Sequence, residues 1–185
     1  VNSFGSDIVA VYTVGGKVSQ IATVTFSQLA FSFSVFAGQN FGAKKYDRIL
    51  EGSRKALRMV VGLSLLSTVV IILAANQVAL LFLNAGETEI LAGSAQMIRI
   101  QACFYVFLGA IWVYNSALRG VGDVRTTVYS SVVELCAKVG LSVLLARLVG
   151  YVGIWFAEPI GWILGLLVSG IVFCGKKWMG RAEFS

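Results

Sequence analysis

Five long stretches of apolar residues, interrupted by short polar segments, run along the chain. Each is at least as long as the roughly 20 mainly apolar residues that a helix needs to cross about 30 Å of hydrocarbon. The pattern therefore predicts an all-α, polytopic membrane helix bundle of about five transmembrane helices. We expect these helices at residues 14–38, 57–83, 98–118, 124–148 and 152–174.

The composition agrees with a membrane protein. Hydrophobic residues make up 57% of the chain, charged residues only 13%, and a single proline occurs among 185 residues. A typical soluble domain has about 25% charged residues, so this chain lacks the polar surface that contact with water requires. We therefore expect a multi-pass protein of the cell membrane, which in bacteria is the inner membrane.

The basic residues predict which side of the membrane each end faces. They gather in the segments 44–58, 119–125 and 176–181, which lie at alternate helix ends. Because cytoplasmic loops carry an excess of Lys and Arg, the N-terminus of this chain should lie outside and its C-terminus in the cytoplasm. No cleavable signal peptide precedes this N-out start, which suggests that further helices come before it. The net charge of +6 follows helix ends, so we expect contact with lipid headgroups and none with nucleic acid.

The residues of an enzyme or a metal site are missing from the sequence. Histidine is absent, and Cys103, Cys136 and Cys174 stand alone in apolar segments without metal-ligand spacing. No nucleophile with a base and no pair of catalytic carboxylates emerges. We expect no catalytic residue, no cofactor and no metal, and we interpret the cysteines as small buried hydrophobic residues.

Polar side chains form one stripe on each of three predicted helices, if each residue turns the helix by about 100°. Such stripes are either interhelical hydrogen bonds, which are routine in membrane bundles, or the lining of a water-accessible central cavity for substrate and ions. Both interpretations stay open. The candidate pathway residues are Gln20, Ser27, Gln101, Tyr105, Trp112, Asn115, Glu134 and Lys138.

Glu134 and Lys138 carry the charge of these stripes. A charge near the bilayer centre costs roughly 2.5 to 3.5 kcal/mol, so it needs a partner or water. Four residues apart with Glu first, the two side chains can form an ion pair on one helix face. Such a pair either pins neighbouring helices together or makes Glu134 a proton site, because burial favours the neutral carboxyl group while the cation favours the charged form.

A further acidic residue lies inside the last predicted helix, beside the proline. Pro159 removes one backbone hydrogen bond and loosens the helix, so Glu158 and Pro159 can act as a hinge. Alternatively, Glu158 reaches the outer interface and meets Arg147 or Lys17. The sequence leaves both possibilities open.

Two polar turns and one helical segment resemble a known family. The segment 38–43 reads Gly-Gln-Asn-Phe-Gly-Ala, and the segment 118–123 reads Leu-Arg-Gly-Val-Gly-Asp. Both resemble turns of the multidrug and toxic compound extrusion (MATE) family, where similar sequences follow the second and fourth helices of each six-helix half. The segment 153–162, Gly-Ile-Trp-Phe-Ala-Glu-Pro-Ile-Gly-Trp, is similar to the final helix of many bacterial members.

The resemblance runs along nearly the whole chain but covers only part of the family's architecture. Members have twelve helices in two lobes, and the chain resembles helices eight to twelve. This implies that residues 1–185 form a C-terminal lobe without its first helix. The resemblance also implies a secondary active antiporter that exports organic cations or drugs in exchange for H⁺ or Na⁺. Its implied partners are the missing N-terminal lobe or a second copy of the chain, and a small organic cation.

One departure from the family puts its coupling site in doubt. Some members place an acidic residue on helix ten, whereas the segment 98–118 contains no Asp or Glu. Coupling would then rest on the absent lobe, on Glu134, or on both. Two other functions stay open. One is a flippase for lipid-linked sugars from the same superfamily, which would need a broad cationic cavity. The other is a truncated bundle that transports nothing alone.

Overall fold

This computed structural model describes residues 5–83, 87–176 and 178–179. The described part contains six α-helices and no strand. The predicted all-α membrane fold is confirmed. Lys177 and Arg181, which belong to the third basic segment, lie outside the described residues. In chain order the helices are α1 (Ser6–Gly42), α2 (Tyr46–Leu80), α3 (Thr88–Ala102), α4 (Tyr105–Gly120), α5 (Val124–Val149) and α6 (Tyr151–Cys174).

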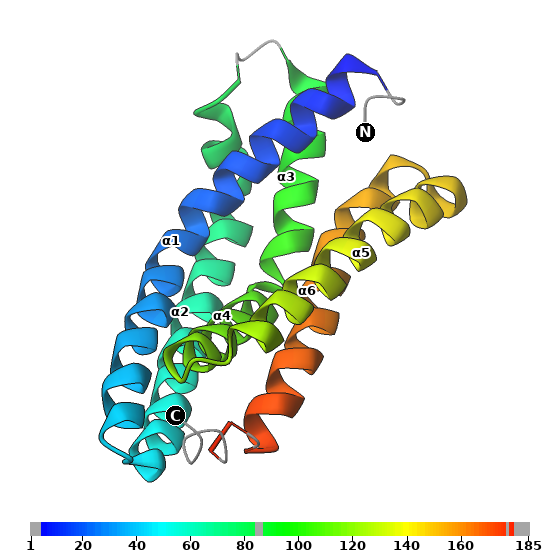
Figure 1. Cartoon of the computed structure of the whole chain (residues 1–185). Helices are drawn as coiled ribbons and strands as arrows, with labels where there is room; N and C mark the ends of the chain where they lie inside the picture. The colour runs from blue at the N-terminus through cyan, green and yellow to red at the C-terminus, as the bar shows by residue number, and fades with distance from the viewer. Residues whose placement is uncertain (1–4, 84–86, 177, 180–185) are drawn as a thin grey trace.

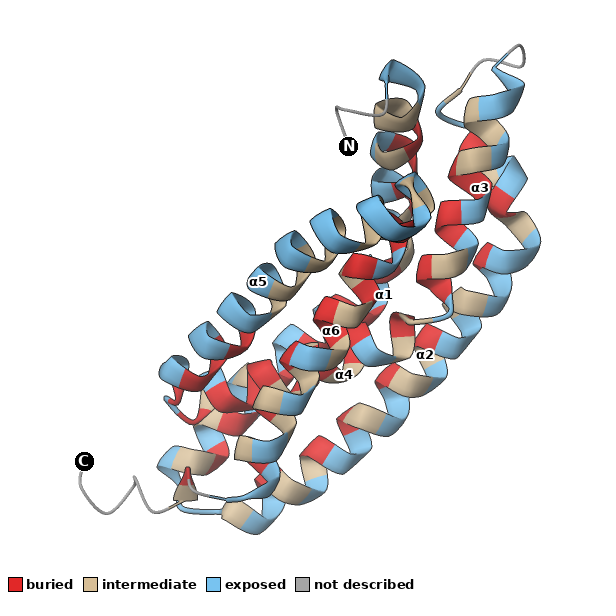
Figure 2. Cartoon of the chain, turned by 90° about the vertical axis from the view of Figure 1, so that its right-hand side faces the viewer, coloured by how far each residue is buried: buried red, intermediate tan, exposed pale blue. Residues whose placement is uncertain are grey.

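The helices form two long antiparallel pairs with the shorter α3 and α4 between them (Figure 1). α1 and α2 make one pair, and α5 and α6 make the other. α4 packs on α1, α2 and α6, and its Ile111, Val113 and Leu118 are almost fully buried. In contrast, α5 leaves most of its length exposed (Figure 2). The core of the bundle therefore lies around α4.

Fewer helices qualify as membrane spans than the sequence predicts. By length and composition, α1, α2 and α6 are each suited to cross a membrane, and α3 with α4 makes a fourth span if the two count as one. These counts refer to the described residues. The helix not included is α5, which has 26 residues, or about 39 Å of helix, and runs antiparallel to α6 (Figure 1). A fifth span formed by α5 stays a prediction.

The structure divides the single helix expected at 98–118 into α3 and α4. The two helices meet at Cys103 and Phe104 and are bent by 52°. The carbonyl group of Ala102, at the end of α3, accepts a 2.6 Å hydrogen bond from Thr68 Oγ1 of α2. A broken helix is tolerated in hydrocarbon only where its freed backbone groups find such partners. The break therefore depends on a neighbouring helix and not on a local Gly or Pro.

The two turn segments that resemble the MATE family pack against each other at one end of the bundle. A Cβ atom built on Gly120, the last residue of α4, would lie 2.8 Å from the Ala37 Cβ and 3.1 Å from the Gly38 nitrogen of α1. No side chain fits between two backbones at that distance. The glycines of both segments thus allow α1 and α4 to approach each other directly.

Asp123 caps the start of α5. Its carboxylate accepts hydrogen bonds from the Thr126 backbone N–H, at 3.4 Å, and from the Thr126 hydroxyl, at 2.8 Å. Loss of an N-cap costs about 1 kcal/mol, so Asp123→Ala should lower the free energy of unfolding by about that amount. Thermal unfolding of the purified protein measures this loss. Asp7→Ala, in the exposed first turn of α1, is the control, and an equal loss in both variants would contradict the capping role.

α6 approaches α5 closely through its glycines. A Cβ atom on Gly161 would lie 3.1 Å from the carbonyl oxygen of Glu134, and one on Gly165 would lie 3.3 Å from that of Ser130. Ser130 Oγ also donates a 2.9 Å hydrogen bond to the Gly165 carbonyl oxygen. Small residues and hydroxyl groups are the usual means of close helix packing in membranes. These contacts fix the register in which α5 and α6 face each other.

Candidate functional site

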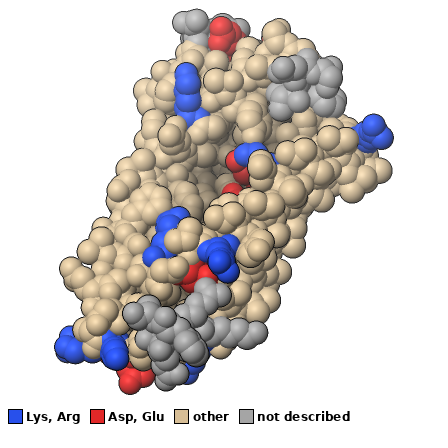
Figure 3. Space-filling view, viewed as in Figure 1, with Lys and Arg blue, Asp and Glu red and all other residues tan. Residues whose placement is uncertain are grey.

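A cavity of about 240 Å³ lies where α1, α3, α4, α5 and α6 meet. The face seen in Figure 3 is largely uncharged, and acidic and basic atoms gather at the edge of a hollow near its middle. Ionisable groups inside membrane segments are costly and usually functional. The cavity is lined by Gly16, Ser19, Gln20, Thr23, Gln101, Leu108, Trp112, Glu134, Glu158 and Trp162.

Glu158 of α6 makes the central polar contacts at this cavity. One carboxylate oxygen forms an ion pair with Lys138 Nζ of α5, and the other accepts a 2.9 Å hydrogen bond from Gln101 Nε2 of α3. The Lys138 and Glu158 side chains keep 36% and 23% of their surface exposed, so the pair is not sealed inside the bundle. Hydrogen bonds to ionised groups are roughly twice as strong as neutral ones. The carboxylate is therefore held in place from two neighbouring helices.

The hydrogen bonds continue from Gln101 to α1 and α4. Ser19 Oγ donates a 2.6 Å hydrogen bond to Gln101 Oε1, and the Tyr105 hydroxyl donates a 3.0 Å bond to Ser19 Oγ. Gln101 and Tyr105 are fully buried and lie on either side of the break between α3 and α4. The contacts join one side chain from each of five helices. This polar network consists of Tyr105, Ser19, Gln101, Glu158 and Lys138.

The prediction of an ion pair between Glu134 and Lys138 is wrong, because Lys138 pairs with Glu158. The contact of Glu158 with Arg147 or Lys17, which the sequence left as a possibility, is not formed in the described structure, because Glu158 pairs with Lys138. The reason is the register of the α5–α6 hairpin, in which the backbone at Glu134 and Ser130 lies against Gly161 and Gly165, so that Lys138 lies beside Glu158. Glu134 instead lines the cavity, and within the described part of the chain it has no hydrogen bond or ion pair.

Six of the eight candidate pathway residues lie at the cavity or in the polar network. The two others lie apart from both. Ser27 donates a 2.8 Å hydrogen bond to the Val24 carbonyl oxygen of its own helix, and Asn115 is buried with an Oδ1 that has no partner among the described residues. The six are Gln20, Gln101, Tyr105, Trp112, Glu134 and Lys138.

Ser19 and Trp162 are among the cavity residues that the sequence analysis missed. Ser19 lies four residues before Thr23 and therefore on the same helical face, so the helical period could have found it. Trp162 carried no signal, because an aromatic residue in an apolar helix is typical of simple packing. Pro159 is buried inside α6, which continues past it. A hinge at Glu158 and Pro159 stays a prediction.

The ionisable side chains at the cavity can carry one more negative charge than positive charge. Glu134 and Glu158 supply two negative charges when ionised, and Lys138 supplies one positive charge. Within the described residues, no group of three or more His, Cys, Asp and Glu side chains could hold a metal ion. The rings of Trp112 and Trp162 line the same space, and aromatic faces attract organic cations. The site is therefore suited to a small cation with an aromatic or apolar body.

Comparison with known proteins finds membrane transporters. The family model described as MatE matches residues 1–144. The "Probable multidrug resistance protein YoeA" of Bacillus subtilis (strain 168) is 26% identical over 176 residues, which cover 91% of this chain and 36% of that protein. The chain thus spans little more than a third of the length of this curated relative.

Solved structures share the fold over almost the whole chain. A MATE protein in the bent conformation matches with a TM-score of 0.84 and 19% identity, covering 97% of this chain and 39% of that one. An outward-facing multidrug resistance MATE family transporter of the MOP superfamily matches with a TM-score of 0.83 and 19% identity, over 96% and 40% of the two chains. Its inward-facing counterpart gives 0.83 and 18%, over 95% and 40%.

Proposed function

Because the chain belongs to the MatE family, we propose that it forms part of a secondary active antiporter that exports organic cations or drugs in exchange for H⁺ or Na⁺. The chain spans 36% of its curated relative. The other segments of a longer protein, or a second copy of the chain, would therefore supply the rest of the structure. The chain together with these parts is called the complete transporter below.

The charge of the cavity carries this proposal. Glu134 and Glu158 outnumber Lys138, so one further positive charge restores neutrality. An organic cation can supply that charge, and so can a proton or a sodium ion, but both together would leave a net positive site. Competition for one site couples the two movements, because each ion favours the conformation in which it binds more tightly.

The polar network links this site to the helices around it. In our proposal Glu158 and Glu134 bind the cation or the coupling ion, and Lys138 neutralises Glu158 when the site is empty. Gln101 connects Glu158 to Ser19 of α1. A change in occupancy at Glu158 would therefore alter contacts on α1, α3 and α5. Pro159, next to Glu158, would let α6 bend as these contacts change.

Alternating access would expose the cavity to each side of the membrane in turn. The fold of the chain resembles the outward-facing and the inward-facing relative equally well. This similarity supports a lobe that moves as one body against the rest of the complete transporter. The cavity would then open or close at the boundary between the lobe and its partner.

A flippase for lipid-linked sugars is less well supported. The pyrophosphate of such a substrate needs several cationic side chains, whereas the residues that line the cavity include two acids and no Lys or Arg among those described. A bundle that transports nothing alone is compatible with the chain covering only 36% of its curated relative. That alternative concerns only the isolated chain. Testing the complete transporter beside the isolated chain distinguishes it from the proposed antiporter.

Export of a fluorescent lipophilic cation tests the proposed function. The chain alone and the complete transporter are expressed in cells that lack their main efflux pumps, and insertion is confirmed by membrane fractionation. We expect export by the complete transporter that stops when the H⁺ and Na⁺ gradients are collapsed. Export by the chain alone would indicate that copies assemble. No export by a well-inserted complete transporter would contradict the proposal.

The proposed orientation places the turn between α1 and α2 in the cytoplasm and the start of α3 outside, because the basic residues gather at the first of these ends. Both ends offer exposed sites for single cysteines, Ala43 and Thr88. In a variant without the native cysteines, a membrane-impermeant thiol reagent should label Thr88→Cys in intact cells. Ala43→Cys should react only after the membrane is opened. The reverse pattern would overturn the orientation.

A further inference from the structure

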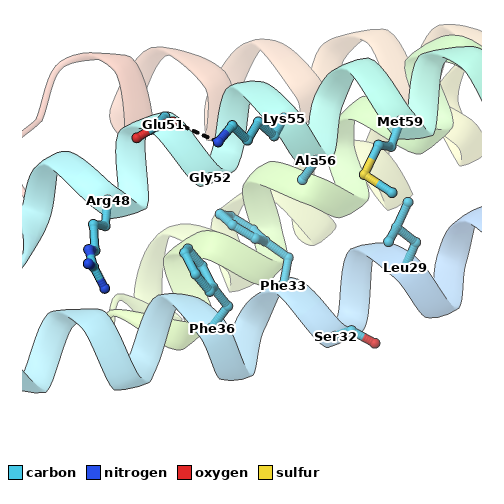
Figure 4. Close-up of a pocket in the computed structure, with 10 residues that line it drawn as sticks. All are labelled: Leu29, Ser32, Phe33, Phe36, Arg48, Glu51, Gly52, Lys55, Ala56 and Met59. Atoms are coloured by element: carbon cyan, nitrogen blue, oxygen red, sulfur yellow. Dashed lines mark ion pairs between the residues drawn. The ribbon is translucent and has the colours of Figure 1, made fainter.

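An apolar groove of about 480 Å³ runs between the end of α1 and the start of α2, away from the charged cavity (Figure 4). The stacked rings of Phe33 and Phe36, 5.6 Å apart, point from α1 toward α2. Gly52 leaves space for these rings, since a Cβ atom there would lie 2.5 Å from Phe36 Cε1. Leu29 and Met59 line the far end. The walls of the groove are therefore largely apolar along its length.

The end of the groove near the α1–α2 turn is basic. Arg48 points into the space between the two helices, and within the described residues it forms no ion pair (Figure 4). Glu51 is the acidic residue of the lining, and its carboxylate pairs with Lys55 at 2.7 Å along α2. Arg48 also lines an adjoining hollow of about 490 Å³. That hollow is lined by Lys44, Lys45, Tyr46, Asp47, Arg48, Leu50, Lys176 and Met179.

We propose that this groove binds one anionic phospholipid, with its phosphate at Arg48 and one acyl chain between α1 and α2. The charge and the position of the groove both fit this ligand. Basic residues at the end of a membrane helix attract anionic headgroups. From Arg48 to Met59 the α2 helix rises about 16 Å. The groove thus leads from the basic segment 44–58 to the first residues of the apolar stretch 57–83, on the side of the α1–α2 turn.

The groove is narrower than a whole helix from the rest of the complete transporter. A volume of about 480 Å³ spread over about 16 Å corresponds to a cross-section of roughly 30 Å². A helix with its side chains is 10–12 Å across, so its cross-section is roughly three times larger. A single acyl chain suits the available width. The rim of the groove, which includes Phe36 and Met59, is exposed, so an acyl chain can enter from the bilayer.

Quenching by brominated lipid tests the site in the chain itself. A Met59→Trp variant is reconstituted in phosphatidylcholine vesicles that contain a small fraction of phospholipid with brominated acyl chains, either phosphatidylglycerol or phosphatidylcholine. The signal of the four native Trp residues is subtracted by using the parent protein. We expect brominated phosphatidylglycerol to quench the new Trp at a lower mole fraction than brominated phosphatidylcholine. Native mass spectrometry of the extracted protein should find one retained phosphatidylglycerol.

Two variants separate the headgroup from the acyl chain. Arg48→Gln should reduce the preference for phosphatidylglycerol about fivefold, the effect of one basic residue near an anionic surface. Arg54→Gln removes the same charge from an exposed position outside the groove and should reduce the preference much less. Gly52→Leu should fill the groove and lower quenching by both lipids, whereas Gly62→Ala, in open space on α2, should not.

Three results would overturn the proposal. The first is equal quenching by both brominated lipids in the parent sequence, and the second is an equal loss with Arg48→Gln and Arg54→Gln. The third is a Trp at position 59 that brominated lipid quenches in the isolated chain but not in the complete transporter, because a protein segment would then cover the groove. None of these results depends on transport. The proposed function can therefore fail while the lipid site is supported, and the lipid site can fail while the proposed function is supported.

Discussion

Glu158→Gln in the complete transporter is expected to slow the export of a lipophilic cation by about 30-fold at low substrate concentration. The change removes the charge that pairs with Lys138 and accepts a hydrogen bond from Gln101. Loss of the carboxylate that would pair with a bound cation costs about 2–5 kcal/mol, and we take about 2 kcal/mol because both side chains are partly exposed. That value corresponds to roughly 30-fold in affinity. Initial rates of dye export from energised vesicles measure the effect.

Controls distinguish loss of binding from loss of folding. Glu89→Gln removes a carboxylate from the exposed start of α3, and export should stay within about twofold of the parent, as for most surface substitutions. The double variant Glu158→Gln with Lys138→Met leaves no unpaired ammonium. It should recover the thermal stability of the parent without recovering export. If Glu158→Gln exports as fast as Glu89→Gln, Glu158 does not belong to the site.

Gly120→Leu is expected to cause the largest loss of stability. The new Cβ atom would overlap the backbone at Ser34 and lie 2.8 Å from the Ala37 Cβ. Overpacking usually costs 1–3 kcal/mol, and a collision with backbone atoms cannot be relieved by a side-chain rotation, so we expect at least about 3 kcal/mol. The variant should give little monodisperse protein on size exclusion and a lower thermal midpoint.

Gly62→Leu is the matched control for this prediction. Gly62 lies inside α2, and a Cβ atom there would meet nothing within 4 Å. Leu favours helix over Gly by up to about 1 kcal/mol, so this variant should be at least as stable as the parent. If both glycine variants lose stability equally, the close approach of α1 and α4 at Gly120 is not important for the fold.

The helices of this fold could be predicted from the sequence because their apolar stretches are long and their polar ends are clear. The break between α3 and α4 could not, since the residues around Cys103 and Phe104 include no Gly or Pro. Its carbonyl partner, Thr68, is far away in the sequence. A break that a neighbouring helix stabilises leaves no local pattern to read.

The candidate site was predicted in part. The helical period found Gln20, Gln101 and Trp112, because polar and aromatic residues on one face recur at a fixed angle. The partner of Lys138 was predicted incorrectly, since a four-residue spacing makes Glu134 the obvious choice on one helix. Glu158 lies on the next helix, and the close packing of α5 and α6 decides that pairing.

Ion-driven counterflow in proteoliposomes tests whether one cavity exchanges an organic cation for H⁺ or Na⁺. The complete transporter is reconstituted with a fluorescent lipophilic cation inside, and an inward gradient of H⁺ or of Na⁺ is then imposed. We expect one gradient to drive the dye out, an opposing dye gradient to move the same ion the other way, and Glu158→Gln to suppress both movements. Dye movement that ignores both gradients in well-inserted protein, or that Glu158→Gln leaves unchanged, would contradict this exchange.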